Sequence, residues 1–127
     1  MAAGTSLLLV FIGGGIGASM RYLMEFGIVR IFPWDDGRPW SILMINLFGC
    51  LLLGLLAGWL GRHQQAAPWL SPLLVTGILG GFTTFSTFAL QLAKLSLMGE
   101  SKTGLLLALA SVLGGYLLAA SGYLATR

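Results

Sequence analysis

The sequence predicts an all-α integral membrane protein in which four transmembrane helices form a single domain over residues 1–127. Of the 127 residues, 57% are hydrophobic and only 9% are charged, whereas soluble domains have about 25% charged residues. Four apolar stretches each reach the length of about 20 residues that a helix needs to cross a bilayer. The connections between them are too short for a soluble domain, so any activity must take place within or across the membrane.

The four predicted spans follow one another along the chain. The first, residues 5–31, lacks the basic start of a cleaved signal peptide and is too long for one, so we expect it to remain a helix. The others cover residues 40–60, 69–93 and 103–126 and contain no Asp, Glu, Lys or Arg. Glycine and other small residues recur four apart in all four spans, which allows close helix contacts within the chain and with a partner subunit.

The third span contains an unusual segment, residues 80–88, with the sequence Gly-Gly-Phe-Thr-Thr-Phe-Ser-Thr-Phe. Each glycine weakens a helix by roughly 1 kcal/mol relative to alanine, and hydroxyl side chains can bond backbone groups that a break would free. Non-helical backbone at membrane depth is tolerated only where protein buries it or where it lines a water-filled path. We therefore predict a break near residues 80–84, with a polar site or pore beside it.

Positive charges are nearly balanced between the two sides of the membrane. One side has the amino terminus and two arginines, Arg62 and Arg127. The other side has four cationic residues, namely Arg30, Arg38, Lys94 and Lys102. Cytoplasmic loops usually carry a clear excess of Lys and Arg. The weak bias is compatible with insertion in both orientations, and two opposed copies would pair about an axis in the membrane plane.

Few polar residues lie within the spans, and the residues alone leave their roles open. Asn46 can join helices or line a pore. Arg21 can pair with Glu25 four residues later, or can place a fixed positive charge at the mouth of an anion path. Ser111 can bond back to its own helix, and the single Cys50 is most simply a small packing residue.

Three segments together carry a resemblance to a known family. Residues 13–22 read Gly-Gly-Gly-Ile-Gly-Ala-Ser-Met-Arg-Tyr, residues 46–49 read Asn-Leu-Phe-Gly, and residues 76–88 read Thr-Gly-Ile-Leu-Gly-Gly-Phe-Thr-Thr-Phe-Ser-Thr-Phe. In their order, and in the length and layout of the chain, they resemble the fluoride channels known as Fluc or CrcB. The resemblance implies a fluoride-selective channel rather than an enzyme, which would relieve cytosolic fluoride toxicity by passive efflux.

The resemblance also implies an assembly and a location. The chain would be a multi-pass protein of the plasma membrane. In a cell that has two membranes, this is the inner membrane. It would form a dual-topology antiparallel homodimer with two fluoride pores. A structural sodium ion at the dimer interface would be held by the backbone carbonyls of Gly80 and Thr83 from each subunit.

Positions carried over from the family define the expected pore. Phe85 and Phe88 would turn the electropositive edges of their rings toward fluoride, and because they are three apart they share a face if a helix resumes after Thr83. Asn46 would donate hydrogen bonds to the ion. The other expected pore residues are Arg21 near the vestibule, Thr84, Ser86 and Thr87 near the break, and Ser111 at the start of a polar track on the fourth helix.

The chain departs from the family pattern at two places. Ile42 and Met44 stand where hydroxyl residues are expected before Asn46, and Gly115 and Ala119 stand where other members often have serine and threonine. The polar track on the fourth helix is therefore shortened, and more of the selectivity should rest on residues 80–88 and Asn46.

Other classes of protein fit less well. A small dual-topology multidrug-type exporter would need a titratable carboxylate deep in the membrane to couple protons to transport. Glu25 is the only acidic residue within a span, and it lies late in the first one. The sequence has no nucleophile and base pair and no metal-ligand set of an enzyme, and no basic cluster suited to nucleic acid.

Overall fold

The computed structural model describes residues 2–32, 40–63 and 67–127. Its elements are α1 (Ala3–Ile31), α2 (Trp40–His63), η1 (Ser71–Leu79), α3 (Gly80–Phe82), α4 (Phe85–Leu97) and α5 (Ser101–Thr126), and the described ranges contain no strand. Arg38, which entered the charge count, lies outside these ranges. Four helical runs are long and apolar enough to cross a membrane, the third being Ser71–Leu97. The predicted all-α fold with four membrane-length helices is confirmed.

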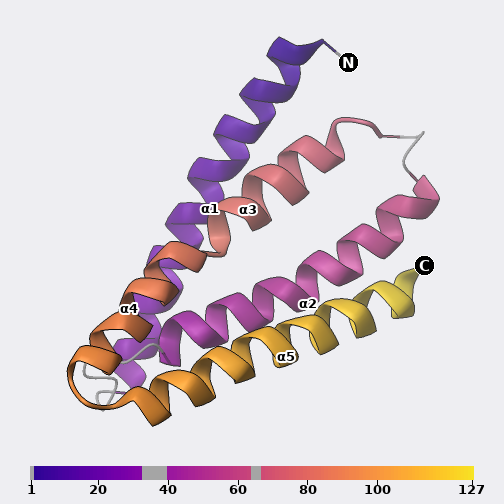
Figure 1. The fold of residues 1–127 in the computed structure, drawn as a ribbon. Coiled ribbons are helices and arrows are strands. Elements are labelled where there is room, and N and C mark those ends of the chain that lie inside the picture. Colours follow the sequence, from indigo (N-terminus) through magenta and orange to yellow (C-terminus); the bar gives the residue numbers. More distant parts are fainter. Residues whose placement is uncertain (1, 33–39, 64–66) are drawn as a thin grey trace.

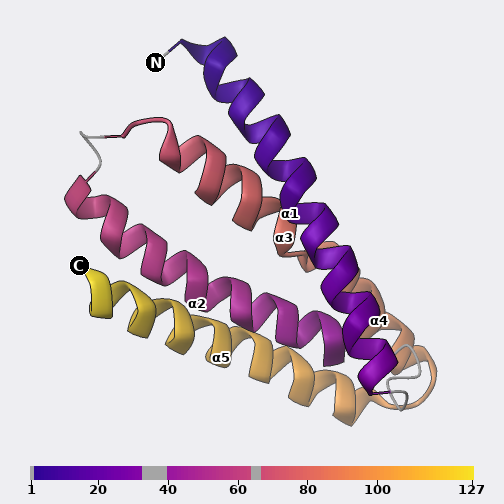
Figure 2. The same cartoon turned by 180° about the vertical axis from the view of Figure 1, so that it is seen from behind.

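The helices run alternately in opposite directions and form two arms (Figure 1). In one arm α1 packs on η1 and α3, and in the other α2 and α5 lie side by side and antiparallel. Both termini lie at the open end of the arms, and α4 closes the opposite end, where it packs against α5 (Figure 2). This arrangement places the junction of α3 and α4 near the middle of the molecule.

Glycines bring α1 into direct backbone contact with η1 and α3. A Cβ atom on Gly13 would lie 2.9 Å from the Cα of Gly77, and one on Gly81 would lie 3.0 Å from the Cα of Gly14. A Cβ on Gly17 would overlap the carbonyl of Ile78. The small residues four apart in these helices therefore face one another across this contact, as close packing of helices in lipid requires.

The contact between α2 and α5 is built in the same way. A Cβ on Gly122 would lie 2.7 Å from the carbonyl oxygen of Leu51, and one on Gly54 would overlap the carbonyl of Ala119. The hydroxyl of Thr126 adds a bond across the contact, because it donates to the carbonyl of Leu55 at 2.8 Å. These backbone approaches hold the second arm together with few buried side chains.

Element η1 is a π-helix of nine residues. The amide of Gly80 at its end donates to the carbonyl of Val75 five residues earlier, as well as to that of Gly77. Most π-helices are single-turn bulges inside α-helices and often occur at functional sites. Here the wide turns lead directly into α3 and the segment that follows it.

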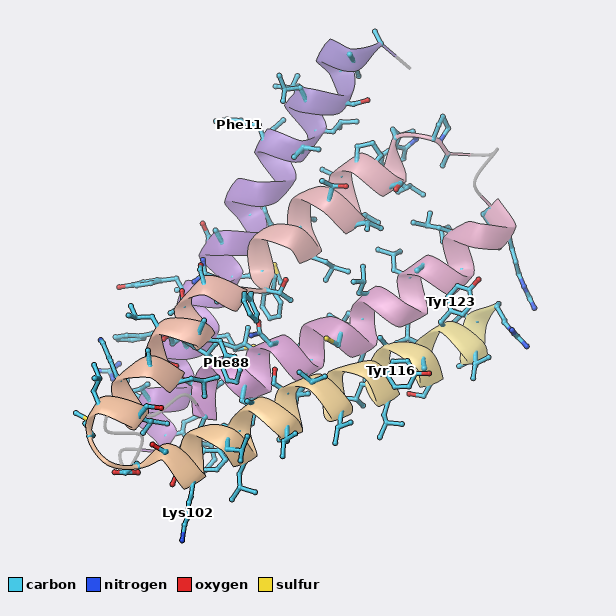
Figure 3. The ribbon with its side chains drawn as sticks, viewed as in Figure 1. Phe11, Phe88, Lys102, Tyr116 and Tyr123 are labelled. Atoms are coloured by element: carbon cyan, nitrogen blue, oxygen red, sulfur yellow. The ribbon has the colours of Figure 1, made fainter. Side chains whose placement is uncertain are left out.

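One cluster of buried apolar side chains lies where α2, α4 and α5 meet. It contains five buried side chains with two partly buried neighbours, namely Ile42, Leu43, Phe88, Leu95 and Leu107, with Leu47 and Leu92. Many other large apolar side chains point outward, including Phe11 on α1 and Tyr116 on α5 (Figure 3). Such a surface needs lipid or another protein subunit around it.

Candidate functional site: a polar pocket beside the junction of α3 and α4

Two threonines with extended backbone separate α3 from α4. Thr83 has φ −88° and ψ 155°, and Thr84 has φ −149° and ψ 118°. The Thr83 hydroxyl donates to the carbonyl of Leu79 at 3.0 Å, so it caps the preceding helix. The Thr84 hydroxyl accepts from the amide of Thr87 at 3.4 Å and caps the next one. The Thr84 hydroxyl thus replaces a backbone bond that a continuous helix would have made, whereas the Thr83 hydroxyl adds a second bond to a carbonyl that already accepts from the Thr83 amide at 3.1 Å.

Asn46 on α2 clamps the same segment. Its Nδ2 donates to the carbonyl of Thr84 at 2.9 Å, and its Oδ1 accepts from the amide of Thr84 at 2.9 Å. Of the two roles left open by the sequence, the structure shows the joining of two elements. A side-chain amide has two N–H donors, and only one is used in this pair, so the second remains for another acceptor.

The clamp redirects the backbone donors of the segment. In a continuous helix the amide of Thr84 would bond the carbonyl of Gly80, but here it bonds Asn46. The amide of Thr87 likewise bonds the hydroxyl of Thr84 instead of the carbonyl of Thr83. The carbonyls of Gly80 and Thr83 therefore lose their usual helical donors, which makes both of them acceptors for another group.

A pocket of about 230 Å³ opens beside this clamp. Five of the residues expected in the pore line it, and its walls come from α2, η1, α4 and α5 and from the Thr83–Thr84 segment. The lining residues are Asn46, Gly49, Cys50, Leu53, Leu79, Thr83, Thr84, Phe85, Phe88 and Ser111. None of them is charged, so the polarity of the pocket comes from amide, hydroxyl and backbone groups.

The two phenylalanines of the pocket differ in their surroundings. Phe88 is only 3% exposed and belongs to the core between α4 and its neighbours, whereas Phe85 is 81% exposed. Sequence spacing alone suggested a shared face. Both residues line the pocket. Phe85 is the first residue of α4 and stands at the exposed rim, and Phe88 lies against the wall.

Ser111 and Cys50 complete the wall. The hydroxyls of Ser19 and Ser121 donate to carbonyls of their own helices, but Ser111 has no such bond in the described part of the chain. Of the roles considered for Ser111, the bond back to its own helix is therefore not seen, and Ser111 lines the pocket. Gly115, one turn further on α5, lies against Cys50, since a Cβ there would be 3.2 Å from the cysteine sulfur.

Three expected pore residues do not line this pocket. Ser86 is exposed on α4 and Thr87 is bonded to Thr84, the hydroxyl of Thr84 donating to that of Thr87 at 3.1 Å. The Nε of Arg21 on α1 donates to the carbonyl of Gly81 at 3.4 Å. Within the described residues Arg21 forms no ion pair with Glu25, so the simpler of its two roles is not seen. Arg21 therefore places its positive charge near the junction of α3 and α4, on the side where α1 packs.

Gly49 is a site residue that the sequence interpretation missed. A Cβ at this position would overlap the Cγ2 of Thr83, so the absence of a side chain lets the segment approach α2. The spacing contained a signal, because Gly49 lies three residues after Asn46 and therefore on the same face of the helix. Leu53 and Leu79 form apolar parts of the pocket wall. Hydropathy alone does not distinguish such residues from those that face lipid.

Fold and site define a multi-pass membrane protein with an uncharged polar pocket among its apolar helices. Comparison with known proteins agrees with this class: the family model described as CrcB-like protein, Camphor Resistance (CrcB), matches residues 8–123. The chain therefore belongs to the CrcB family.

Relatives with assigned names cover most of the chain. A protein of Hyphomonas neptunium is 45% identical over 109 residues, which are 84% of each chain. One of Roseobacter denitrificans is 43% identical over 95 residues, or 75% of this chain and 74% of the relative. One of Dichelobacter nodosus is 46% identical over 88 residues, or 68% of each. All three are named fluoride-specific ion channel FluC.

Proposed function

We propose that this chain is a fluoride-selective ion channel and not an enzyme, and that it releases fluoride passively across the cell membrane. Membership of the CrcB family and the names of the relatives support this function. The observation that carries it in the structure is the Asn46–Thr84 clamp beside an uncharged pocket with aromatic and hydroxyl walls. Passive efflux would relieve fluoride that enters as the neutral acid and is trapped in the cytosol as the anion.

The chemistry of the pocket suits a small, strongly hydrated anion. Stripping water from fluoride is costly and must be offset by closely placed hydrogen-bond donors. Asn46 has a second N–H, and Ser111 has a hydroxyl that bonds no other described residue. The edges of Phe85 and Phe88 carry positive potential without a formal charge. Because conduction requires sites that the ion can leave, donors without fixed charge favour passage over trapping.

The functional unit in this proposal is a dual-topology antiparallel homodimer with two pores, in which the third transmembrane helix is broken at Thr83 and Thr84. The balanced loop charges support insertion in both orientations. The exposure of Phe85 at the pocket rim supports a second wall from a partner, because an ion path needs shielding from lipid on every side. Exposed apolar side chains on α1 and α5 provide surface for both lipid and partner.

The sodium ion of the proposal would bind at the dimer interface. It would be held by the carbonyls of Gly80 and Thr83. Their usual helical donors, the amides of Thr84 and Thr87, bond the side chains of Asn46 and Thr84 instead. Backbone carbonyls are suitable ligands for a hard cation. The ion would supply positive potential and tie the two subunits together, a structural role.

The proposed function is tested by ion efflux from liposomes that contain the purified protein. Liposomes loaded with fluoride should release it down its gradient without nucleotide or a proton gradient, and liposomes loaded with chloride should retain their ion. Protein-free liposomes are the control. Chloride release at the same rate as fluoride would remove selectivity from the proposal, and fluoride release that requires a proton gradient would favour the exporter.

A further inference from the structure

An apolar groove of about 430 Å³ lies between the two arms, with one wall from α2 and the other from η1. Its wall exposes no polar atom, and its main lining residues are Leu52, Leu56 and Trp59 of α2 and Leu74, Ile78 and Leu79 of η1. From Leu52 to Trp59 it follows α2 for about 10 Å of helix rise. Leu79 also lines the polar pocket, so the inner end of the groove adjoins that pocket.

Two arginines lie at the outer end of the groove. Arg62 comes three residues after Trp59, which places it one helical turn further along the same face of α2. Arg127 directly follows Thr126, which also lines the groove. The Nη2 of Arg62 donates to the backbone carbonyl of Arg127, so the two residues are neighbours in space. Both are exposed, and together they place two positive charges beside the groove.

No acidic side chain of the described ranges lies near this pair. The acidic residues there are Glu25 and Glu100, near the end of α1 and between α4 and α5. Both lie toward the end of the molecule that α4 closes, whereas Arg62 and Arg127 lie at the open end (Figure 1). The two arginines therefore keep their positive charge for an external anion. The planar guanidinium group suits phosphate, which it can bind through two parallel hydrogen bonds.

Trp59 marks the depth at which the groove ends. Its ring is stacked on that of His63 with 4.5 Å between the centroids, and Nδ1 of His63 donates to the Trp59 carbonyl at 2.9 Å. Tryptophan is enriched where lipid headgroups meet the acyl chains. The arginines one turn beyond Trp59 are thus at headgroup level, and the groove extends from there to the depth of the acyl chains.

We propose that this groove binds an anionic phospholipid, with one acyl chain between α2 and η1 and the phosphate held by Arg62 and Arg127. Charge complementarity selects this occupant, because an apolar groove that ends at two cations matches a molecule with an apolar chain and an anionic head. Basic sites between membrane helices bind such headgroups. The inference goes beyond the channel function and does not depend on it.

The headgroup contacts are tested by native mass spectrometry of the purified protein in micelles with equal amounts of phosphatidylglycerol and phosphatidylcholine. The wild type should retain phosphatidylglycerol about thirtyfold over phosphatidylcholine, since each cation near the headgroup contributes about fivefold. Arg62→Gln combined with Arg127→Gln should abolish this preference. Lys94→Gln combined with Lys102→Gln is the matched control, because it removes two exposed charges at the closed end, where Figure 3 labels Lys102. No preference in the wild type, or the same loss in both pairs, overturns the inference.

A second pair of variants tests the acyl chain. Leu56→Trp fills the groove and should lose most of the retained phosphatidylglycerol, because it excludes the packing contacts of the chain. Leu113→Trp on α5 should retain it, since Leu113 is 60% exposed and lies outside the groove. Displacement of the lipid by inorganic phosphate as readily as by added phosphatidylglycerol would reduce the site to an anion patch. Conversion of Leu56→Trp to monomers that keep their lipid would assign the groove to a second copy of the chain. Either result overturns the inference.

Discussion

Asn46 connects sequence, structure and proposed function more directly than any other residue. A single amide side chain pairs with both backbone groups of Thr84 and thereby fixes the only extended residues between the helices of the third span. The same pairing frees the carbonyl of Gly80 and holds the remaining N–H of Asn46 at the pocket. One residue therefore positions the segment and can take part in binding the ion.

Replacing Asn46 with aspartate separates these contributions. Asn46→Asp keeps the oxygen that accepts from Thr84 but removes the donor to the Thr84 carbonyl and adds negative charge to the pocket. We expect a stability loss of about 1–3 kcal/mol from the unpaired group and a loss of most fluoride efflux by repulsion. Thermal unfolding and liposome efflux measure the two effects. Ser19→Ala, which removes an exposed hydroxyl bonded to Gly15, is the control; wild-type efflux in Asn46→Asp would exclude the amide from the path.

Phe85 and Phe88 should respond differently to the same substitution. Phe88→Ile removes part of a buried ring from the core and leaves a cavity, so it should both destabilise the protein, by about 1–3 kcal/mol, and reduce efflux greatly. Phe85→Ile alters an exposed ring and should reduce efflux with little change in stability. Comparison of unfolding temperature and efflux in the two variants checks this. Unchanged efflux in both would remove the rings from the mechanism.

At the scale of elements, glycine contacts organise both arms. Gly122 lies against the backbone of Leu51 on α2, so Gly122→Ala would place a methyl group 2.7 Å from a carbonyl oxygen. We expect this overpacking to cost about 1–3 kcal/mol. Gly61→Ala is the matched control on the helix opposite, because a Cβ there meets nothing within 4 Å. Thermal unfolding in detergent compares them, and equal stability would contradict the close contact of α2 with α5.

The elements also show what sequence can predict and why. Four helices of membrane length follow from hydropathy, because lipid requires each span to satisfy its backbone internally. The π-helical form of η1, which packs closely against α1 at Gly13 and Gly17, has no comparable signal in the sequence. The different surroundings of Phe85 and Phe88 depend on where α4 begins relative to its neighbours. Gly49 could have been recognised, as it shares a helix face with Asn46.

At the scale of the whole molecule, orientation in the membrane is the main prediction. Nearly balanced loop charges should produce two populations of the chain, one in each orientation. A tag on one terminus should then be accessible to a membrane-impermeant reagent from both sides in intact cells and inverted vesicles. Added arginines near one membrane face are the control, because they should convert the mixture to one orientation. A single protected population in the unaltered chain would contradict dual topology.

The reversal potential of single channels tests the central claim most directly, because it reports selectivity and passivity together. In a planar bilayer with fluoride on one side and chloride at equal concentration on the other, the claim is that only fluoride passes through the pocket. The account predicts a current that reverses far from zero, at a voltage opposing fluoride flow, and shifts with the fluoride gradient alone. A reversal potential at zero, or one that follows chloride, would contradict it.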